Sequence, residues 1–222
     1  MAASAMFPGG KVDAPPSPWE DLAAPAEDAA WPAAAVKELR LTGRKVLLFC
    51  DFNFEDVEAT FPKMRLEEEG AQVTVCGTHP AGIKYTGKFG CPIVSDKCVS
   101  DIWKNDEYKS YDGVMIPGGF APDYMRRSPD MMNIIRYMVE NQRVVATVCH
   151  GPWMLCSAKV VKDLNVTCFS AVKDDVVAAG GIFHDAPVVV DRGVVTSRLP
   201  KDLPQMTFAM IEEIHRRPAA SS

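Results

Sequence analysis

Hydrophobic residues along this chain occur in short runs that alternate with longer amphipathic segments. Short apolar runs rich in Val, Ile and Leu are typical of strands buried on both faces of a parallel sheet. They predict strands at residues 45–50, 72–76, 113–116, 144–148 and 166–169. The segments between and after them predict helices at residues 55–69, 129–140, 153–158, 172–179 and 202–215. Because strands alternate with helices, we expect an α/β three-layer sandwich with a mainly parallel central sheet.

Two segments give further local signals. The helix at 55–69 should end at Gly70, which is a typical C-terminal cap residue. The hydrophobic residues that predict one face of this helix are Val57, Phe61, Met64 and Leu66. Residues 188–196 predict a hairpin around Asp191-Arg192-Gly193.

The first 40 residues differ from the rest in composition. Ala and Pro dominate there, and dense prolines disfavour both a long helix and a sheet strand. We therefore expect a largely irregular N-terminal extension at 1–40, one folded domain at 41–217 and a short tail at 218–222. Trp19 and Trp31 suggest that the extension docks on its own domain or on a partner subunit.

The bulk composition narrows the class of protein. The chain has 222 residues with a net charge of −5 and no Lys/Arg stripe, which argues against nucleic acid as the main partner. No apolar run is long enough to cross a membrane, and no signal or transit pattern opens the chain. Seven cysteines without a C-x-x-C pair indicate a reducing compartment, so we expect a cytoplasmic protein.

The strongest chemical signal is Cys149. It follows the buried run 144–148 and precedes Gly151 and Pro152, which favour a sharp bend and the start of a helix. This is the pattern of a nucleophile elbow, and a helix N-terminus facing the sulfur would favour the thiolate. His150 is the adjacent candidate for a general base or thiolate partner, although neighbouring side chains at a turn diverge.

Two other turns should lie beside Cys149, because the carboxyl ends of parallel strands meet at one edge of the sheet. In the first turn, Glu55 is the candidate carboxylate beside the thiol, while Asp56 and Glu58 are interpreted as surface or capping residues. In the second turn, the backbone amides of Gly118 and Gly119 could form an oxyanion hole with the amides near His150.

The remaining candidates are less specific. Asp123 follows Pro122 and is either a helix-start acid or a member of the site. His79, His184 and His215 are isolated, so no metal set is expected, and no nucleotide-type glycine loop is present, so we expect no cofactor.

At this point the residues resemble a known family, the DJ-one/PfpI superfamily, and within it the PfpI-like intracellular protease group. The similarity covers about residues 45–213. It is carried, in family order and spacing, by Phe54-Glu55-Asp56-Val57-Glu58, Thr86-Gly87-Lys88, Pro117-Gly118-Gly119, Cys149-His150-Gly151-Pro152, Lys173-Asp174-Asp175 and Ser197-Arg198-Leu199-Pro200.

The resemblance implies a flavodoxin-like sandwich related to class-I glutamine amidotransferases, with Cys149 as nucleophile and Glu55 as the carboxylate touching it. It implies substrate-binding turns at Gly118, Gly119 and Gly151. It further implies a homodimer or hexamer in which Asp123 reaches the Cys-His pair of a neighbouring subunit. Family members are described as peptidases, as cofactor-free glyoxalases and as deglycases.

Three departures from the family pattern qualify this resemblance. Asp123 stands where the family usually has Glu, so its shorter side chain must reach farther. Phe120 stands where relatives often place Arg, so an anionic-substrate contact is lost there. The N-terminal extension is not part of the pattern.

Three functions fit these residues. The first is reactive-aldehyde detoxification, in which the Cys149 thiolate adds to methylglyoxal or its adducts, amides near Gly119 and His150 hold the oxyanion, and Glu55 with His150 moves a proton. The second is an intracellular cysteine peptidase, for which the adjacent Cys149 and His150 are poor geometry. The third is a non-enzymatic redox sensor or chaperone-like stress protein with an oxidisable Cys149.

Overall fold

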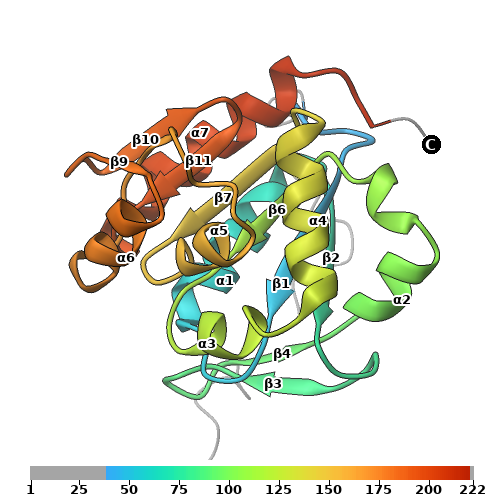
Figure 1. The fold of residues 1–222 in the computed structure, drawn as a ribbon. Coiled ribbons are helices and arrows are strands. Elements are labelled where there is room, and N and C mark those ends of the chain that lie inside the picture. Colours follow the sequence, from blue (N-terminus) through green and yellow to red (C-terminus); the bar gives the residue numbers. More distant parts are fainter. Residues whose placement is uncertain (1–38, 221–222) are drawn as a thin grey trace, which may run out of the picture. The chain divides into compact units, whose positions relative to one another are not determined.

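A seven-stranded sheet with the order β10-β11-β7-β6-β1-β2-β5 forms the centre of the molecule (Figure 1). The computed structural model describes residues 39–220, so the expectations for residues 1–38, including Trp19 and Trp31, lie outside the described residues. The strands are β1 (Lys45–Cys50), β2 (Gln72–Gly77), β5 (Lys97–Cys98), β6 (Gly113–Ile116), β7 (Val144–Val148), β10 (Val188–Asp191) and β11 (Val194–Ser197). All neighbours pair in parallel except β10 with β11, which confirms the mainly parallel sheet.

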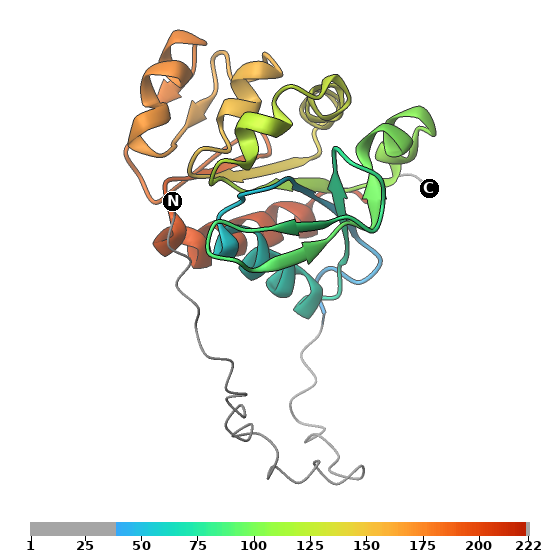
Figure 2. The ribbon, with the colours of Figure 1, turned by 90° about the horizontal axis from the view of Figure 1, so that it is seen from below.

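Helices cover both faces of this sheet. The helices are α1 (Asp56–Glu68), α2 (Val99–Lys104), α3 (Ala121–Met125), α4 (Pro129–Glu140), α5 (Trp153–Ser157), α6 (Lys173–Ala178) and α7 (Leu203–Arg216), with 3₁₀ turns η2 (Glu107–Ser110), η3 (Ser170–Val172) and η4 (Pro200–Asp202). In Figure 2, α1 and α7 lie on one side of the sheet, and α4 and α5 lie on the other. The three-layer α/β sandwich is therefore confirmed.

Two small sheets lie outside the central one. β3 (Lys84–Thr86) and β4 (Pro92–Val94) form a hairpin, and β8 (Asn165–Val166) pairs in parallel with β9 (Ile182–Phe183). The strand predicted at 166–169 is thus wrong in extent. The chain leaves the β8 ladder after Val166, because the backbone N–H of Thr167 donates to the Thr196 hydroxyl and that of Phe169 donates to the Cys149 carbonyl.

The face of α1 that packs against the molecule differs from the prediction. Of the four residues predicted to form the buried face, Leu66 is buried and Phe61 is half-buried, but Val57 and Met64 are 46% and 68% exposed. Ala59 and Pro62 are buried beside Leu66 instead. The buried face of the helix is therefore the stripe of Ala59, Pro62 and Leu66, which are spaced three and four residues apart. This orientation also buries Glu58, with consequences for the site.

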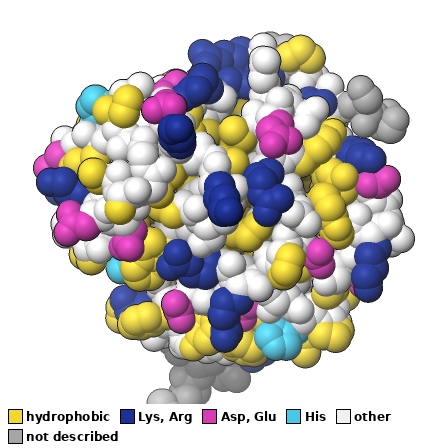
Figure 3. Space-filling model, viewed as in Figure 1, with side chains coloured by type: hydrophobic (Ala, Val, Ile, Leu, Met, Phe, Trp, Pro, Cys, Tyr) yellow, Lys and Arg dark blue, Asp and Glu magenta, His cyan; other side chains and the backbone are white. Residues whose placement is uncertain are grey.

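The predicted hairpin at the carboxyl end of the chain is confirmed. β10 and β11 pair around Arg192 and Gly193, which both have positive φ (48° and 89°), as a type I′ turn requires. Figure 3 shows Lys and Arg side chains spread over one face of the molecule with hydrophobic side chains between them. In residues 39–220, no helix is long and apolar enough to span a membrane.

Candidate active site

Cys149 lies directly after β7, at the carboxyl edge of the sheet. Its φ is +61°, a left-handed conformation that costs a non-glycine residue about 1–2 kcal/mol. Two hydrogen bonds hold the residue there: its N–H donates to the Ser197 carbonyl (3.1 Å), and its carbonyl accepts from the Phe169 N–H (3.0 Å). The surrounding backbone therefore maintains the strained elbow that the sequence predicts.

The three turns at this edge are joined as expected. The N–H of Glu55 donates to the Gly118 carbonyl (3.3 Å), and the N–H of Phe120 donates to the Asn53 carbonyl (2.8 Å). Gly118 lies between the turns, since a Cβ there would lie 2.8 Å from the Cβ of Cys149 and 2.7 Å from Oε2 of Glu58. No side chain larger than hydrogen fits at this position.

The carboxylate beside the Cys149 thiol is Glu58, so the expectation that it is Glu55 is wrong. Glu58 is fully buried in the first turn of α1, and its Oε2 accepts a hydrogen bond from the Gly118 N–H (2.8 Å). Oε1 is buried without a hydrogen-bond partner among the described residues. A hydrogen bond with the Cys149 side chain acts on the pKa of the Glu58 carboxyl, so the two groups lie side by side. Interpreting Glu58 as a surface or capping residue is also wrong, because α1 is rotated relative to the predicted face.

Burial changes the protonation of both groups. Burial raises the pKa of the Glu58 carboxyl to about 7, against the lowering effect of the Gly118 and Cys149 hydrogen bonds. The pKa of the Cys149 thiol is raised to about 12 by burial and then by the Glu58 charge, while the amides of His150 and Gly119 act to lower it. The thiol is therefore not the freely ionised group that the elbow pattern predicts.

The coupling between the two groups defines the state in which the sulfur can react. The Glu58 charge accounts for part of the rise in the pKa of Cys149, so a protonated Glu58 removes that repulsion and can donate a hydrogen bond to a thiolate. One proton shared by this buried pair is consequently more favourable than the loss of both protons.

The predicted oxyanion site is only partly right, because Gly118 does not contribute its amide to it. The N–H of Gly118 is donated to Glu58, so it is not available to an oxyanion. The backbone N–H groups of Gly119 and His150 are the ones directed at Cys149. Gly119 has a φ of +72°, and a side chain there would collide with the backbone of residues 53–55. Two backbone donors beside one sulfur are an arrangement that stabilises an oxyanion on a substrate carbon bound to that sulfur.

The imidazole of His150 lies closer to Cys149 than its adjacency suggested, with Nδ1 3.3 Å from Sγ. Its ring packs between those of Trp153 and Phe169, at centroid distances of 5.2 and 5.1 Å. Burial and the nearby charge of Lys88 lower the pKa of His150. The ring is therefore neutral at pH 7 and can accept a proton.

Glu55 lies at the rim of the site and pairs with Lys88 (3.1 Å), which comes from the loop between β3 and β4. The same ammonium group lies over the rings of Phe89 (5.2 Å) and Phe120 (5.8 Å). Lys88 therefore lies beside the site. It belongs to the Thr86-Gly87-Lys88 motif, but the sequence alone predicted no role for it in the site. Its charge also acts to lower the pKa of Glu58.

A cavity of about 470 Å³ opens beside His150; we call it the His150 cavity. Its lining residues are Asn53, Gly119, Phe120, Asp123, Tyr124, His150 and Trp153. Asp123 is exposed on α3 and lines this cavity within the same chain. Its predicted contact with a neighbouring subunit stays a prediction.

The other predicted site features have structural explanations. The N–H of Gly151 donates to the Val148 carbonyl (2.8 Å), and a side chain there would collide with the Thr147 hydroxyl, so its place in the site is to permit the turn. All seven cysteines are free. Within residues 39–220, no cluster of three or more His, Cys, Asp or Glu side chains is arranged to hold a metal ion.

These features define an α/β sandwich with a flavodoxin-like sheet and a buried cysteine at its carboxyl edge. Residues 44–213 match the model of the DJ-1/PfpI family, and the chain belongs to this family. It is 38% identical over 159 residues to "Deglycase PH1704" of Pyrococcus horikoshii, covering 72% of this chain and 92% of that protein. It is 36% identical over 160 residues to "Putative cysteine protease YraA" of Bacillus subtilis, with the same coverage.

Solved structures agree with this assignment. The DJ-1beta structure of Drosophila melanogaster superposes with a TM-score of 0.72 at 21% identity, covering 79% of this chain and 92% of that chain, which supports the fold. A two-domain protein of Anabaena variabilis with DJ-1/ThiJ/PfpI-like and ferritin-like domains superposes with a TM-score of 0.73 at 33% identity. The superposition covers 77% of this chain and 48% of the Anabaena protein.

Proposed function

We propose that this protein is a cysteine-dependent deglycase or glyoxalase that acts on methylglyoxal or on its adducts with amines. The observation that carries the proposal is the grouping around Cys149 of one buried acid, one neutral imidazole and two backbone amides. Relatives named deglycase support the same reaction class. The His150 cavity, at about 470 Å³, has room for a small carbonyl compound.

The reaction begins at the sulfur. The Cys149 thiolate adds to the aldehyde carbon of methylglyoxal, and the carbonyl oxygen becomes an oxyanion held by the amides of Gly119 and His150. In an amine adduct, the sulfur displaces the amine from the same carbon, and the amine leaves with a proton. Both routes give one hemithioacetal.

The following steps transfer protons. His150, neutral at pH 7, takes the proton from the carbon bearing sulfur, and the neighbouring carbonyl oxygen is protonated to give an enediol. His150 then returns its proton to the second carbon, and the hydroxyl on the sulfur-bearing carbon releases its proton to water, which replaces the one that the carbonyl oxygen took up. The product is a thioester, and water hydrolyses it to lactate and the Cys149 thiol. Glu58 in its protonated form supports the thiolate before addition and after hydrolysis. No redox change of the protein is needed.

The test is lactate formation from methylglyoxal by the purified protein without glutathione. Wild-type protein should produce lactate, and Cys149→Ala should reduce the rate by at least about 10³-fold, since the covalent step is lost. Cys91→Ala is the matched control, because Cys91 is a partly exposed free cysteine outside the site. Absence of lactate from wild-type protein, or equal rates in Cys149→Ala, would contradict the proposal.

A cysteine peptidase is the second candidate. The 3.3 Å approach of His150 to Cys149 and the relative named putative cysteine protease favour it. Hydrolysis of fluorogenic peptides that disappears in Cys149→Ala, in protein that forms no lactate, would support the peptidase instead.

A further inference from the structure

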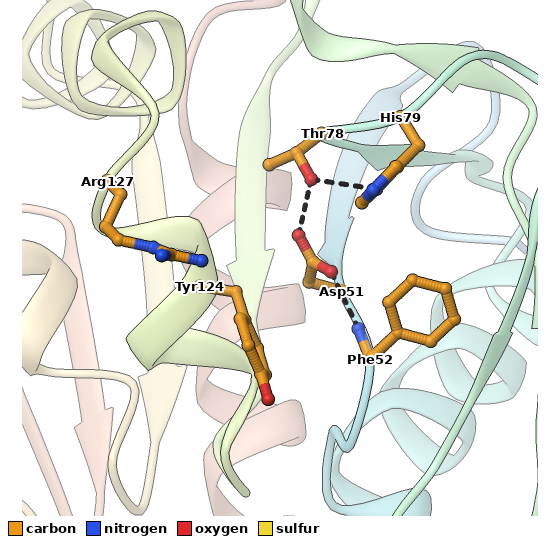
Figure 4. A pocket seen from close by; sticks show the side chains of 6 residues that line it. All are labelled: Asp51, Phe52, Thr78, His79, Tyr124 and Arg127. Atoms are coloured by element: carbon orange, nitrogen blue, oxygen red, sulfur yellow. Dashed lines mark hydrogen bonds between the residues drawn. The ribbon is translucent and has the colours of Figure 1, made fainter.

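A second cavity lies beside the His150 cavity at the carboxyl edge of the sheet. It measures about 480 Å³, and its lining residues are Asp51, Phe52, Thr78, His79, Tyr124 and Arg127. Tyr124 lines both cavities, so they adjoin. In Figure 4, Arg127 and Tyr124 lie on one side of this cavity, and the other four residues lie opposite. We call it the Asp51–Arg127 cavity.

The first wall carries a buried negative charge. Asp51 follows β1 and is 2% exposed. Its carboxylate accepts hydrogen bonds from the Phe52 N–H (2.8 Å) and from the Thr78 hydroxyl (2.5 Å), both neutral donors. Among the described residues it forms no ion pair. Each carboxylate oxygen retains capacity for another hydrogen bond, so a cationic donor in the cavity would meet an available acceptor.

The opposite wall carries a positive charge. Arg127 is exposed at the end of α3, and its guanidinium lies over the Tyr124 ring at 5.5 Å. In the part of the chain that the structure describes, it has no carboxylate partner. Asp51 and Arg127 therefore face the same cavity with opposite charges and no contact between them (Figure 4).

We propose that the Asp51–Arg127 cavity binds the α-ammonium and α-carboxylate groups of a free amino acid. An ammonium group can donate to Asp51, and a carboxylate can accept a forked pair of hydrogen bonds from Arg127. A simple cation would face the uncompensated Arg127, and a simple anion would face Asp51, so a dipolar ligand satisfies both walls. The rings of Phe52 and Tyr124, each 37% exposed, provide apolar contact between the two charges.

The role of the bound amino acid as a substrate rests on the proposed function. A side chain that extends past Tyr124 enters the His150 cavity, where its amine would present a carbonyl adduct to Cys149. The preferred substrate is then an adduct on the side chain of a free amino acid such as lysine, rather than on a residue within a protein.

The binding test uses isothermal titration of the full-length protein with L-lysine. Matched probes are 6-aminohexanoate, which lacks the α-ammonium, 1,5-diaminopentane, which lacks the carboxylate, and Nα-acetyl-L-lysine amide, which lacks both charges. Each probe should bind about tenfold or more weakly than lysine, the effect of one lost charged hydrogen bond. Undetectable binding of lysine, or equal binding of the acetylated amide, would overturn the proposal.

Variants distinguish binding in the Asp51–Arg127 cavity from a general effect of the protein's charge on lysine affinity. Arg127→Gln should weaken lysine binding about tenfold or more and leave 1,5-diaminopentane no weaker. Arg192→Gln, at an exposed arginine in the β10–β11 turn, should leave lysine binding unchanged. Asp51→Asn should also weaken lysine binding, with its thermal unfolding measured in parallel. Unchanged lysine affinity in Arg127→Gln contradicts the inference.

Activity assays distinguish this inference from the proposed function. Lactate from methylglyoxal, with equal kcat/KM for adducts of lysine and of Nα-acetyl-L-lysine amide, would contradict the cavity and retain the function. Selective lysine binding without lactate formation would contradict the function and retain the cavity.

Discussion

At the scale of single residues, the reactivity of Cys149 depends on a carboxyl group that is buried with it. Glu58 gains its raised pKa from complete burial in α1, and the raised pKa of Cys149 arises partly from Glu58. Neither value belongs to one residue, because each proton changes the energy of the other. A strained backbone at Cys149 and an absent side chain at Gly118 bring the two groups together.

Glu58→Gln should change how stability depends on pH. Folded Glu58 holds its proton up to about pH 7, whereas an unfolded Glu loses it near 4.5, so between these values the folded state binds the extra proton. Wild-type stability therefore falls as pH rises through this window, by on the order of 3 kcal/mol. Urea unfolding should show that Glu58→Gln gains this amount relative to wild type by pH 8.

The control for this measurement is Glu55→Gln. Glu55 is the neighbouring acid at the start of α1, but it is partly exposed and pairs with Lys88. Its variant should follow the wild-type pH dependence between 4.5 and 7. Parallel curves for wild type and Glu58→Gln would show that Glu58 is ionised throughout.

At the scale of elements, α1 supplies both the acid of the site and the anchor of a loop at its rim. The carboxylate of Asp56 accepts hydrogen bonds from the backbone N–H groups of Phe89 (2.8 Å) and Cys91 (2.7 Å). Gly87 packs against the same carboxylate, since a Cβ there would lie 2.6 Å from it. Asp56 therefore holds the β3–β4 loop, which carries Lys88, rather than capping its own helix.

Asp56→Ala should lower the free energy of unfolding by about 3 kcal/mol, because two hydrogen bonds to a charged acceptor are lost. Hydrogen exchange of the Phe89 and Cys91 amides should accelerate more than exchange in β1. Asp174→Ala is the matched control, as Asp174 is an exposed acid in the first turn of α6. It should cost no more than about 1 kcal/mol, the effect of a helix-dipole contact. An equal loss of unfolding free energy in Asp56→Ala and Asp174→Ala would contradict the anchoring role of Asp56.

At the scale of the whole molecule, one ion pair and its hydrogen bonds, near the edge of the sheet opposite the site, join the two ends of the folded unit. Arg44 precedes β1 and pairs with Asp112 (2.9 Å), whose side chain is 5% exposed. The same guanidinium donates to the Arg217 carbonyl (2.7 Å), and Asp112 accepts from the backbone N–H of Ala220 (2.8 Å). The start of the domain, the β6 entry and the segment after α7 are thus held at one point.

Arg44→Met should destabilise the protein by about 3 kcal/mol, because it leaves the buried Asp112 carboxylate without its cation. Lys63→Met removes an ion pair of the exposed i,i+4 type with Glu67 and should cost less than about 0.5 kcal/mol. Urea unfolding of both variants measures the difference. A cost for Arg44→Met as small as that for Lys63→Met would contradict the structural role.

The sequence by itself determined the alternation of the main strands and helices, the elbow at Cys149 and the convergence of three turns, because these follow from hydrophobic period, glycine and proline positions and the rule for parallel strands. It did not predict β5 or α2, which are too short to show a clear hydrophobic period. Sequence reasoning placed the wrong acid beside the thiol. Glu55 and Glu58 are equivalent as helix-start acids, and Val57 and Met64 suggested a buried face that is exposed in the structure. Only the tertiary packing of α1 on Ala59, Pro62 and Leu66 decided which carboxyl is buried against the sulfur. The same holds for the Asp51–Arg127 cavity, whose two charges are distant in sequence and meet only through the fold.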